Sequence, residues 1–234
     1  MPEWYPQDKE RLQKDLDNYL SKGKEKQDVH GLIVPHAGYA FSGSIAGKAF
    51  SLLPKQDKAV VIGPSHYIGF QGIKTIHQDS LETPLGSIKI IRDDRFGYLP
   101  KGEIEHAIGN QIPFLQKLGF KAVLPLVIGE IDNNEAKQLA DYLLKHYHLF
   151  IFSTDLSHFL PYEQARHQDK KSINIIENLD FTNWHKIDAC GKYPLLILFY
   201  LCQKLNSKPV LIEYRNSGDI TGDKDRVVGY ASFY

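Results

Sequence analysis

The stretch GLIVPHAGYAFSG, residues 31–43, sets the organisation expected for the whole chain. Its apolar residues 32–34 predict a short buried strand, which Pro35 ends, and a helix is predicted over residues 44–53. His36 follows the strand at its carboxyl end. In open α/β sheets this edge is where ligands bind, because side chains leaving several parallel strands meet in one crevice. His36 is therefore a candidate site residue.

Two other segments repeat this arrangement. Residues 60–66, VVIGPSH, and residues 150–158, FIFSTDLSH, are again apolar strands that run into a turn carrying a histidine. The histidines placed at strand ends are thus His36, His66 and His158. Three equivalent positions favour one shared site over three unrelated structural histidines.

The pattern along the chain alternates strands with helices through short links. It predicts an α/β protein with a mostly parallel central sheet flanked by helices on both faces, and an antiparallel hairpin of residues 72–77 and 87–92 at one edge. The further predicted helices are 6–21, 104–118, 133–145, 162–178, 181–188 and 194–205, and the further strands are 58–62, 121–128, 149–154, 209–214 and 227–233. Residues 22–27 are expected to form a solvated linker, and NSGDITGDKD, residues 216–225, a turn.

Length and charge restrict the classes of protein to consider. A chain of 234 residues, 42% of them hydrophobic, is expected to fold as one domain, residues 1–234, with ample core. Its 28 Lys and Arg residues balance its 28 Asp and Glu residues. A net charge of zero gives no field that would steer the protein to nucleic acid or to an anionic membrane, so neither is an expected partner.

The sequence also lacks the signals expected of membrane or secreted proteins. The longest strongly apolar run, residues 193–202, is about half of what a bilayer crossing requires. The amino-terminal sequence MPEWYPQDKERLQKD carries charges where a secretory signal needs an apolar core. Two cysteines, Cys190 and Cys202, are too few for a disulfide framework. These features predict a cytoplasmic protein with free thiols.

The two cysteines have different surroundings in the sequence. Cys202 lies among leucines on a predicted apolar helix, which indicates a core residue. Cys190 lies in the turn DACGKYP beside a glycine, which suits metal binding or nucleophilic work. Imidazole and thiolate are good ligands for iron, copper and zinc. His36, His66 and Cys190 are therefore candidates for one metal site, provided that the fold brings them together.

Asp155 and His158 are candidates for proton transfer. Asp155 precedes His158 by three residues and can orient or charge the imidazole, which then acts as a general base or acid. A serine hydrolase that uses Ser65 or Ser153 is an alternative, but neither serine lies in a GxSxG elbow. The phosphate-loop motif GxxxxGK[ST] is absent from the sequence.

Several segments together resemble the Memo family in order and spacing. They are EWYP at the amino terminus, PHAGYAFSG (35–43), VVIGPSHY (60–67), EHAI (105–108) with IPFLQ (112–116), STDLSH (153–158), DACG (188–191) with Pro194, and SGDITGD (217–223) followed by VVGYAS (227–232). The match runs nearly end to end, and motifs in series are more specific than any one of them.

The resemblance implies a fold similar to that of class III extradiol dioxygenases, whose iron is held by two histidines and a carboxylate. His36, His66 and Cys190 match the metal-ligand positions, with the thiol in place of the carboxylate. His158 matches the catalytic base of the dioxygenases, and Asp155 lies close to it. The pocket expected around them is lined by Trp4, Tyr39, Ser65, Tyr67, Glu105 and His106.

The cofactor implied by the resemblance is iron or copper, with zinc as an alternative, and it can be absent from the purified protein. A thiolate ligand favours Cu(I), Zn(II) or thiolate-bound iron over the oxygen-rich environment of extradiol chemistry. Ring cleavage therefore does not follow from the fold. Two hypotheses remain: a metal-dependent, dioxygenase-like redox enzyme, or a non-catalytic module that uses the vestigial pocket to bind.

The partners implied by the resemblance are proteins. Prokaryotic members of the family resemble protein B of the AmmeMemoRadiSam system, which is encoded with an AMMECR-type protein and a radical SAM enzyme. These two proteins, a peptide or a small molecule are the expected partners of the binding module.

One position departs from the pattern of the family. EHAIG, residues 105–109, stands where the family usually has EHSIE, so Gly109 replaces the second acid. Glycine weakens helix propensity by up to about 1 kcal/mol. The first acid, Glu105, is explained without chemistry as a carboxylate at the amino terminus of a helix.

Overall fold

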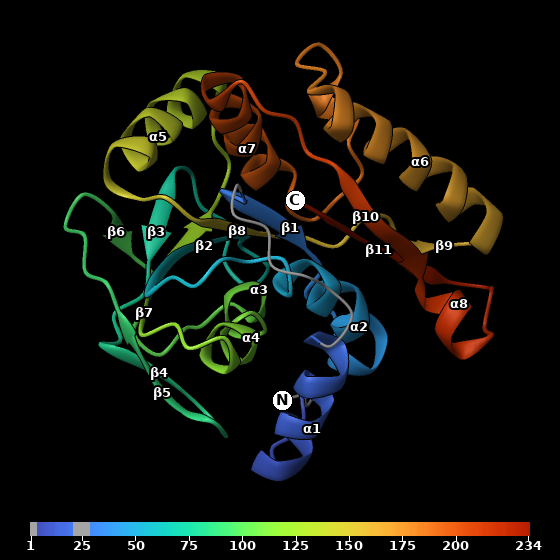
Figure 1. The fold of residues 1–234 in the computed structure, drawn as a ribbon. Helices are drawn as coiled ribbons and strands as arrows, with labels where there is room; N and C mark the ends of the chain where they lie inside the picture. The colour runs from blue at the N-terminus through green and yellow to red at the C-terminus, as the bar shows by residue number, and fades with distance from the viewer. Residues whose placement is uncertain (1–3, 21–28) are drawn as a thin grey trace.

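The centre of the computed structural model, which describes residues 4–20 and 29–234, is an eleven-stranded sheet (Figure 1). The strands are β1 (Gly31–Val34), β2 (Lys58–Pro64), β3 (Ile73–Thr75), β4 (Ser80–Thr83), β5 (Gly86–Ile90), β6 (Gly97–Tyr98), β7 (Ala122–Ile128), β8 (Phe150–Ser153), β9 (His158–Leu160), β10 (Leu211–Asn216) and β11 (Val227–Phe233). Their order is β10-β11-β1-β8-β2-β7-β3-β6, while β5 joins β4 to β7 and β9 pairs with β11.

The four central strands run parallel to one another. In register, Ile33 of β1 lies beside Phe152 of β8, Phe152 beside Ile62 of β2, and Ile62 beside Leu126 of β7. β11 and β3 pair with the central strands in the antiparallel sense. The predicted α/β fold with a mostly parallel sheet is confirmed.

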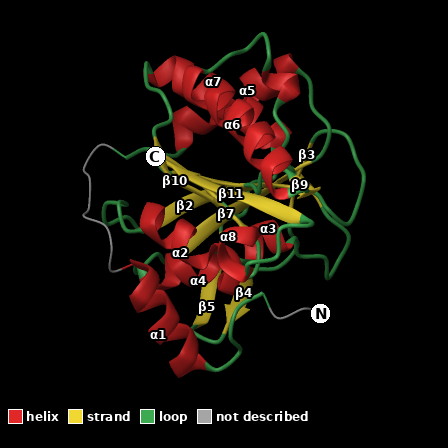
Figure 2. Cartoon of the chain, turned by 90° about the vertical axis from the view of Figure 1, so that its right-hand side faces the viewer, coloured by secondary structure: helices red, strands yellow, loops and turns green. Residues whose placement is uncertain are grey.

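Helices cover both faces of this sheet (Figure 2). They are α1 (Lys9–Leu20), α2 (Tyr39–Phe50), α3 (His106–Gly109), α4 (Ile112–Lys117), α5 (Asn133–His146), α6 (Tyr162–Asn178), α7 (Lys192–Leu205) and α8 (Ser217–Thr221), with one 3-10 turn at Trp184–Lys186. α5, α6 and α7 lie on one face, and α1, α2 and α4 on the other. Each face therefore has a core of its own.

Successive residues of β1 divide between the two cores. Ile33 packs in the core under α5 and α7, whereas Leu32 and Val34 pack in the core under α1 and α2. All three are buried, and burying such a side chain stabilises the fold by roughly 1.5–3 kcal/mol. The uninterrupted apolar run thus fits a strand that is covered on both faces.

The amphipathic helix predicted near the amino terminus is α1. Its residues Leu12 and Leu16 are fully buried. α1 approaches α2 closely at Tyr19, because a Cβ atom added to Gly47 would lie 2.4 Å from the Tyr19 Cβ and 2.7 Å from the Tyr19 carbonyl oxygen. Only glycine at position 47 leaves room for this contact. The linker predicted over residues 22–27 lies outside the described residues.

The predicted hairpin was wrong in its strands. Residues 73–75 form β3, which pairs with β7 and β6, and the hairpin consists of β4 and β5. The reason lies in the turn: Leu81 and Thr83, in the region expected to connect the strands, belong to β4. The chain therefore reverses only at residues 84–85, and Gly86 has a φ of +118°. Glycine tolerates that angle, which L side chains rarely adopt.

The helix predicted over residues 104–118 is two short helices, α3 and α4. Pro113 lies in the first turn of α4 and has no N–H to donate to residue 109, so the hydrogen-bond ladder stops there. Asn110 and Gln111 form the break, and their side chains bond to residues elsewhere in the chain. The helix predicted over residues 181–188 is limited to the 3-10 turn.

Two other helix ends differ from the prediction. α2 begins at Tyr39 rather than at residue 44, so Ser42 lies within the helix, where its hydroxyl donates to the Ala37 carbonyl. The predicted turn of residues 216–225 contains α8, because Asn216 and Asp219 form a capping box at its start. α5 likewise begins with a capping box, formed by Asp132 and Glu135.

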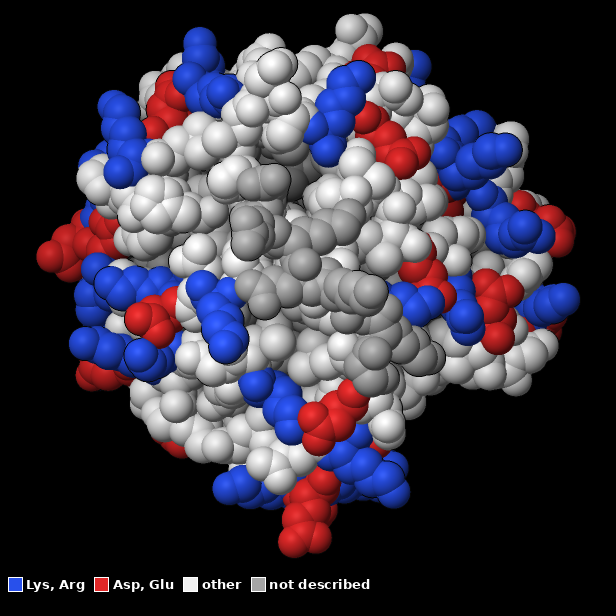
Figure 3. Space-filling model, in the orientation of Figure 1, with Lys and Arg blue, Asp and Glu red and all other residues white. Residues whose placement is uncertain are grey.

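The outer surface carries both signs of charge. Lys and Arg residues are interspersed with Asp and Glu residues on the face shown in Figure 3, as the zero net charge suggests. Among the described residues, 4–20 and 29–234, no helix has the length and apolar character needed to cross a bilayer.

Candidate metal centre

Three neighbouring parallel strands place polar residues at the same edge of the sheet. β1 ends at Val34, β2 at Pro64 and β8 at Ser153, and two residues beyond these ends stand His36, His66 and Asp155. Because the strands are parallel and adjacent, equal offsets bring the three residues together. The predicted convergence is confirmed for His36 and His66. The third predicted histidine, His158, instead begins β9, and Asp155 takes the equivalent place after β8.

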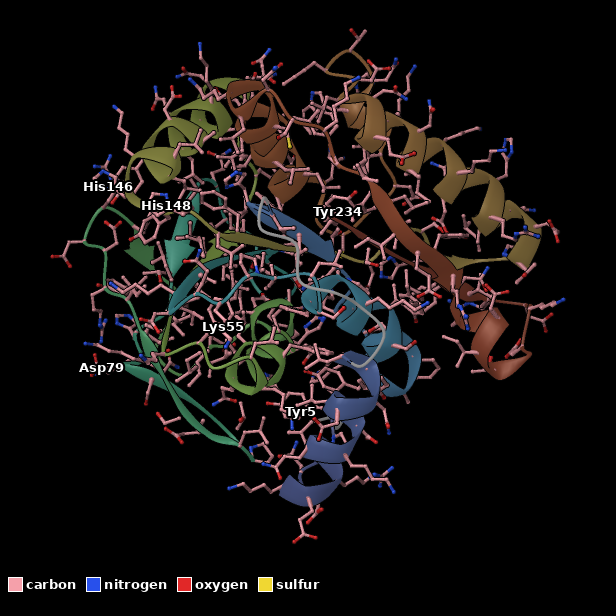
Figure 4. The ribbon with its side chains drawn as sticks, in the orientation of Figure 1. Tyr5, Lys55, Asp79, His146, His148 and Tyr234 are labelled. Carbon is pink, nitrogen blue, oxygen red and sulfur yellow. The ribbon has the colours of Figure 1, made fainter. Side chains whose placement is uncertain are left out.

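The opposite edge of the sheet has a separate group of basic residues. Lys55, His146 and His148, labelled in Figure 4, precede the amino ends of β2 and β8 and line one hollow together. The chain has ten histidines. The topology therefore places the histidines that follow strands, such as His36 and His66, at one edge of the sheet. The histidines that precede a strand, His146 and His148, lie at the other edge.

Cys190 reaches the site from the loop before α7. Its backbone N–H donates to the Asp155 carbonyl at 3.3 Å, and the Asp155 N–H donates back to the Cys190 Sγ at 3.2 Å. The next residue, Gly191, donates its N–H to the Thr154 hydroxyl at 2.8 Å. A Cβ atom on Gly191 would lie 2.5 Å from the Thr154 Cβ, so glycine allows this close approach. The loop is thereby fixed to the segment that follows β8.

His36, His66 and Cys190 form one group of metal-ligand atoms. The His36 Nε2 lies 3.3 Å from the Cys190 Sγ, and the ligand atoms of all three residues lie within 4.8 Å of one another. Metal–nitrogen distances of about 2.0–2.1 Å and metal–sulfur distances of about 2.3 Å place such atoms about 3.1–3.5 Å apart at octahedral or tetrahedral angles. The observed separation of nitrogen and sulfur fits a shared ion.

The His36 ring is oriented by partners behind it. Its Nδ1 lies 3.0 Å from the Ser153 Oγ, which also accepts a hydrogen bond from the Gln111 Nε2 at 2.9 Å. When Nδ1–H donates to this oxygen, Nε2 keeps its lone pair toward Cys190. Burial lowers the pKa of His36 well below its ordinary value, so the ring is the neutral form that metals bind. Ser153 is fully buried, which suits an orienting group rather than a nucleophile.

The His66 ring is held by Glu105. The Glu105 carboxylate accepts hydrogen bonds from the His66 backbone N–H at 2.7 Å and from the Tyr67 N–H at 3.1 Å, and its Oε2 lies 3.1 Å from the His66 Nδ1. The capping role proposed for Glu105 was wrong, because its side chain makes no capping bond to α3. Burial raises the pKa of Glu105, but the hydrogen bonds from His66 and Tyr67 outweigh it, so the pKa lies below its ordinary value.

His106 lies against the metal-ligand group. Its ring centroid is 4.3 Å from that of His66 and 4.4 Å from that of Trp4, which stacks on it at 8°. The Tyr67 hydroxyl lies 2.8 Å from the His106 Nδ1. Burial lowers the pKa of His106 to about 3, and the imidazole is therefore neutral near pH 7. A second group of metal-ligand atoms, within 4.8 Å of one another, comprises His66, Glu105 and His106.

The amino-terminal segment is attached to the site by its backbone and its aromatic rings. The Tyr39 N–H donates to the Trp4 carbonyl at 2.8 Å, and the Tyr5 and Tyr39 rings lie 5.4 Å apart; Tyr5 is labelled in Figure 4. Tyr39 is buried and donates its hydroxyl to the Asn110 carbonyl at 2.7 Å. Trp4 and Tyr5 thus hold the amino-terminal segment against the site, and the buried Tyr39 supports both contacts.

Asp155 bonds to the backbone of one ligand residue. Its Oδ1 accepts the His36 N–H at 2.8 Å, and its Oδ2 lies 4.0 Å from the His36 Nε2. Burial raises the pKa of Asp155 to about 6, although the His36 N–H acts in the opposite direction. His158 is exposed on β9, and its charge affects the pKa values of both His36 and Asp155. The proton-transfer candidates therefore lie beside the metal-ligand group.

Two hollows adjoin the group. One, of about 780 Å³, is lined by Trp4, Tyr67, Ile104, Glu105 and His106, among others. The other, of about 470 Å³, includes Ser65 and Cys190. Ser65 donates its hydroxyl to the Ile68 carbonyl at 2.6 Å. The structure thus provides space for a ligand beside Tyr67 and His106 and, separately, beside Ser65 and Cys190.

Residues that support the site were missed from the sequence. Asn110 donates its side-chain N–H to the His36 carbonyl at 2.6 Å, and Gln111 donates to the Pro35 carbonyl at 3.1 Å. Both are buried amides in the break between α3 and α4. The only available signal was Pro113, which marks the break but does not show where the two side chains point.

Comparison with known proteins gives a consistent family match. A family model described as Memo-like protein matches residues 2–234. A MEMO1 family protein of Methanococcoides burtonii is 36% identical, with 88% of this chain and 86% of the relative covered. A MEMO1 family protein of Aquifex aeolicus is 32% identical, with 97% and 94% covered, and one of Archaeoglobus fulgidus is 32% identical with the same coverage.

Proposed function

The chain belongs to the Memo-like protein family, and on this premise we propose that His36, His66 and Cys190 hold one iron or copper ion for a redox reaction. The observation that carries the proposal is the 3.3 Å separation of the His36 Nε2 and the Cys190 Sγ, with His66 beside them. A bound ion would supply a Lewis acid and an electron carrier with open coordination positions. A cytoplasmic location suits a site that needs a reduced thiol.

The surrounding residues have distinct roles in this proposal. Ser153 orients the His36 ring, and Asp155 holds the backbone of His36 together with the Cys190 loop. His158 is exposed beside this group, so it can exchange a proton between a substrate and water. The hollow beside His106 receives the substrate, and its aromatic walls exclude part of the solvent.

Metal binding tests the proposal directly. Protein reconstituted anaerobically with Fe(II) or Cu(I), then desalted, is expected to keep one ion per chain by elemental analysis. Oxidation should give an electron paramagnetic resonance spectrum of a single mononuclear species. Protein that retains neither ion, although it is folded by circular dichroism, would contradict the proposal.

The pH dependence of metal binding gives a second measurement. Burial raises the pKa of the Cys190 thiol to about 12, so the metal-free chain carries the proton at neutral pH and must release it when a metal binds. Because burial lowers the pKa of His36, that ring is already neutral. We therefore expect affinity to rise about tenfold per pH unit between roughly pH 7.5 and 9.

Proton release can be counted independently of affinity. In weakly buffered solution at pH 8, a pH indicator should report one proton released per bound Zn(II). Binding that is independent of pH over this range would show that Cys190 does not ligate the ion as a thiolate.

A second candidate function is a binding module. The observation that favours it is the hollow of about 780 Å³ with the exposed Tyr67 and the half-buried Trp4 at its wall, since aromatic residues are enriched at recognition surfaces. The candidate partners are an AMMECR-type protein, a radical SAM enzyme, a peptide or a small molecule. In this case the site would recognise rather than convert its ligand.

Calorimetric titration with the two candidate partner proteins separates this function from the first. Trp4→Ala is expected to weaken binding of a partner at least tenfold, because it removes the ring stacked on His106. Ile220→Ala, at an exposed residue of α8, is the matched control and should bind as the unaltered chain does. Equal affinity of the Trp4 variant and the control would place recognition elsewhere.

A further inference from the structure

Glu105 has a position that its helix does not explain. It stands immediately before α3, where a carboxylate can cap the helix, yet it makes no capping bond. The residue is only 2% exposed. A buried carboxylate is costly unless several hydrogen bonds satisfy it. Its partners therefore indicate what the residue does.

All four short contacts of the Glu105 carboxylate lie in the turn that carries His66. Oε1 accepts hydrogen bonds from the His66 N–H at 2.7 Å and from the Tyr67 N–H at 3.1 Å, and it lies 3.2 Å from the Ser65 hydroxyl, whose proton it shares with the Ile68 carbonyl. Oε2 lies 3.1 Å from the His66 Nδ1. One side chain thus holds both the backbone and the ring of the same residue, 39 positions earlier in the chain.

The contact with the ring selects a tautomer. A carboxylate only accepts hydrogen bonds, so a neutral His66 ring must carry its proton on Nδ1 to bond with Oε2. The lone pair then lies on Nε2, on the side of the ring away from Glu105. The His36 and His66 ring centroids are 5.1 Å apart, and one ring nitrogen of each lies within 4.8 Å of the Cys190 Sγ. Glu105 therefore presents His66 in the form that can bind a metal.

Packing fixes the distance between Glu105 and its partners. α3 lies tightly on β2, since a Cβ atom on Gly63 would be 2.9 Å from the Ala107 Cβ. Gly63 precedes His66 by three residues, and Ala107 follows Glu105 by two. This contact fixes the distance between α3 and the turn that carries His66. The packing of α3 on β2, and not a mobile loop, therefore positions the Glu105 carboxylate.

We infer that Glu105 is a positioning residue, which fixes the tautomer and the direction of His66 for the metal site. This inference rests on the proposed function, in which His66 is a ligand. Carboxylates that hold a metal-binding histidine in this way increase metal affinity about 10–100-fold. A direct ligand role for Glu105 is less consistent with the structure, because each of its oxygens is already hydrogen bonded.

The tautomer of His66 can be measured without any metal. Two-dimensional ¹H–¹⁵N spectra optimised for ring couplings distinguish Nδ1–H from Nε2–H imidazoles. The metal-free chain is expected to show His66 with its proton on Nδ1. In Glu105→Gln the amide oxygen can still accept the backbone N–H groups, but the NH₂ group donates toward Nδ1. The proton of His66 is then expected to move to Nε2.

Metal affinity gives the second readout. Co(II), whose absorption reports its ligands, is expected to bind Glu105→Gln about 10–100-fold more weakly than the unaltered chain. Glu105→Asp keeps an acceptor-only group, so it should preserve the Nδ1–H tautomer and recover part of the affinity. Glu103→Gln removes the same charge from an exposed residue in the same loop and should change neither property.

The outcomes separate this inference from the proposed function. If the unaltered chain binds no Co(II), the proposed function fails, while the tautomer spectra still test the role of Glu105. If the unaltered chain binds Co(II) and Glu105→Gln binds it equally well with the same tautomer, the inference fails and the metal site stands. If Glu105→Gln does not fold, an Nε2–H tautomer of His66 in the unaltered chain overturns the inference.

Discussion

Cys190→Ser and His36→Ala are each expected to abolish stoichiometric metal binding. Each substitution removes one of the three ligand atoms that lie within 4.8 Å of one another. A serine hydroxyl remains protonated and is a poor ligand for Cu(I) or thiolate-preferring iron. Because the loss of residues that only orient a ligand costs about 10–100-fold in affinity, the loss of a ligand should exceed about 100-fold. Anaerobic elemental analysis after desalting measures the effect.

Cys202→Ser is the matched control for the thiol. Cys202 lies on α7 in contact with the core that contains Leu198 and Leu201, away from the strand ends that carry His36 and His66. This variant should retain one ion and keep the sulfur-to-Co(II) charge-transfer band, which Cys190→Ser should lack. Retention of metal by both Cys190→Ser and His36→Ala would remove the basis of the proposed site.

Gly47→Ala is expected to cause the largest loss of stability among single methyl additions near the amino terminus. The new Cβ atom would meet the Cβ and the backbone carbonyl of Tyr19 at 2.4 and 2.7 Å, and backbone cannot rotate away. Overpacking of this kind typically costs about 1–3 kcal/mol. For a chain of this size each kcal/mol lowers the unfolding midpoint by roughly 2–4 °C. Thermal unfolding followed by circular dichroism would measure the shift.

Gly109→Ala adds the same methyl group where the structure leaves space. No atom lies within 4 Å of a Cβ atom at this position, and its φ is not in the left-handed region. Alanine should therefore improve helix propensity in α3 by up to about 1 kcal/mol. Equal midpoints for the Gly47 and Gly109 variants would mean that α1 moves away from α2 without cost, and that their contact does not stabilise the fold.

The elements that could be predicted from the sequence are those whose own residues are apolar enough to require burial. The apolar runs that became β1, β2, β7 and β8 are covered on both faces, so their hydrophobicity alone marks them. A parallel arrangement of such strands places the residues after them at one edge. This reasoning alone predicts that His36 and His66 lie together.

What the sequence did not predict depends on contacts between distant segments. Glu105 was explained as a helix cap because its nearest neighbours in the sequence form a helix, but its carboxylate bonds to His66 instead. Gln111 lay inside a predicted helix, yet its side chain reaches Ser153. The helix propensity of neighbouring residues predicts neither contact, because each contact depends on which faces of distant elements pack together.

The equal spacing of His36, His66 and Asp155, each two residues beyond a strand, restricts how chain length can vary during evolution. A one-residue insertion between β1 and His36 would turn the imidazole away from the other two positions, because neighbouring residues of an extended chain point to opposite sides. Insertions in the β4–β5 turn carry no such penalty, since that turn lies outside the group. Length differences among functional descendants should therefore accumulate at that turn and be absent from these two-residue connectors.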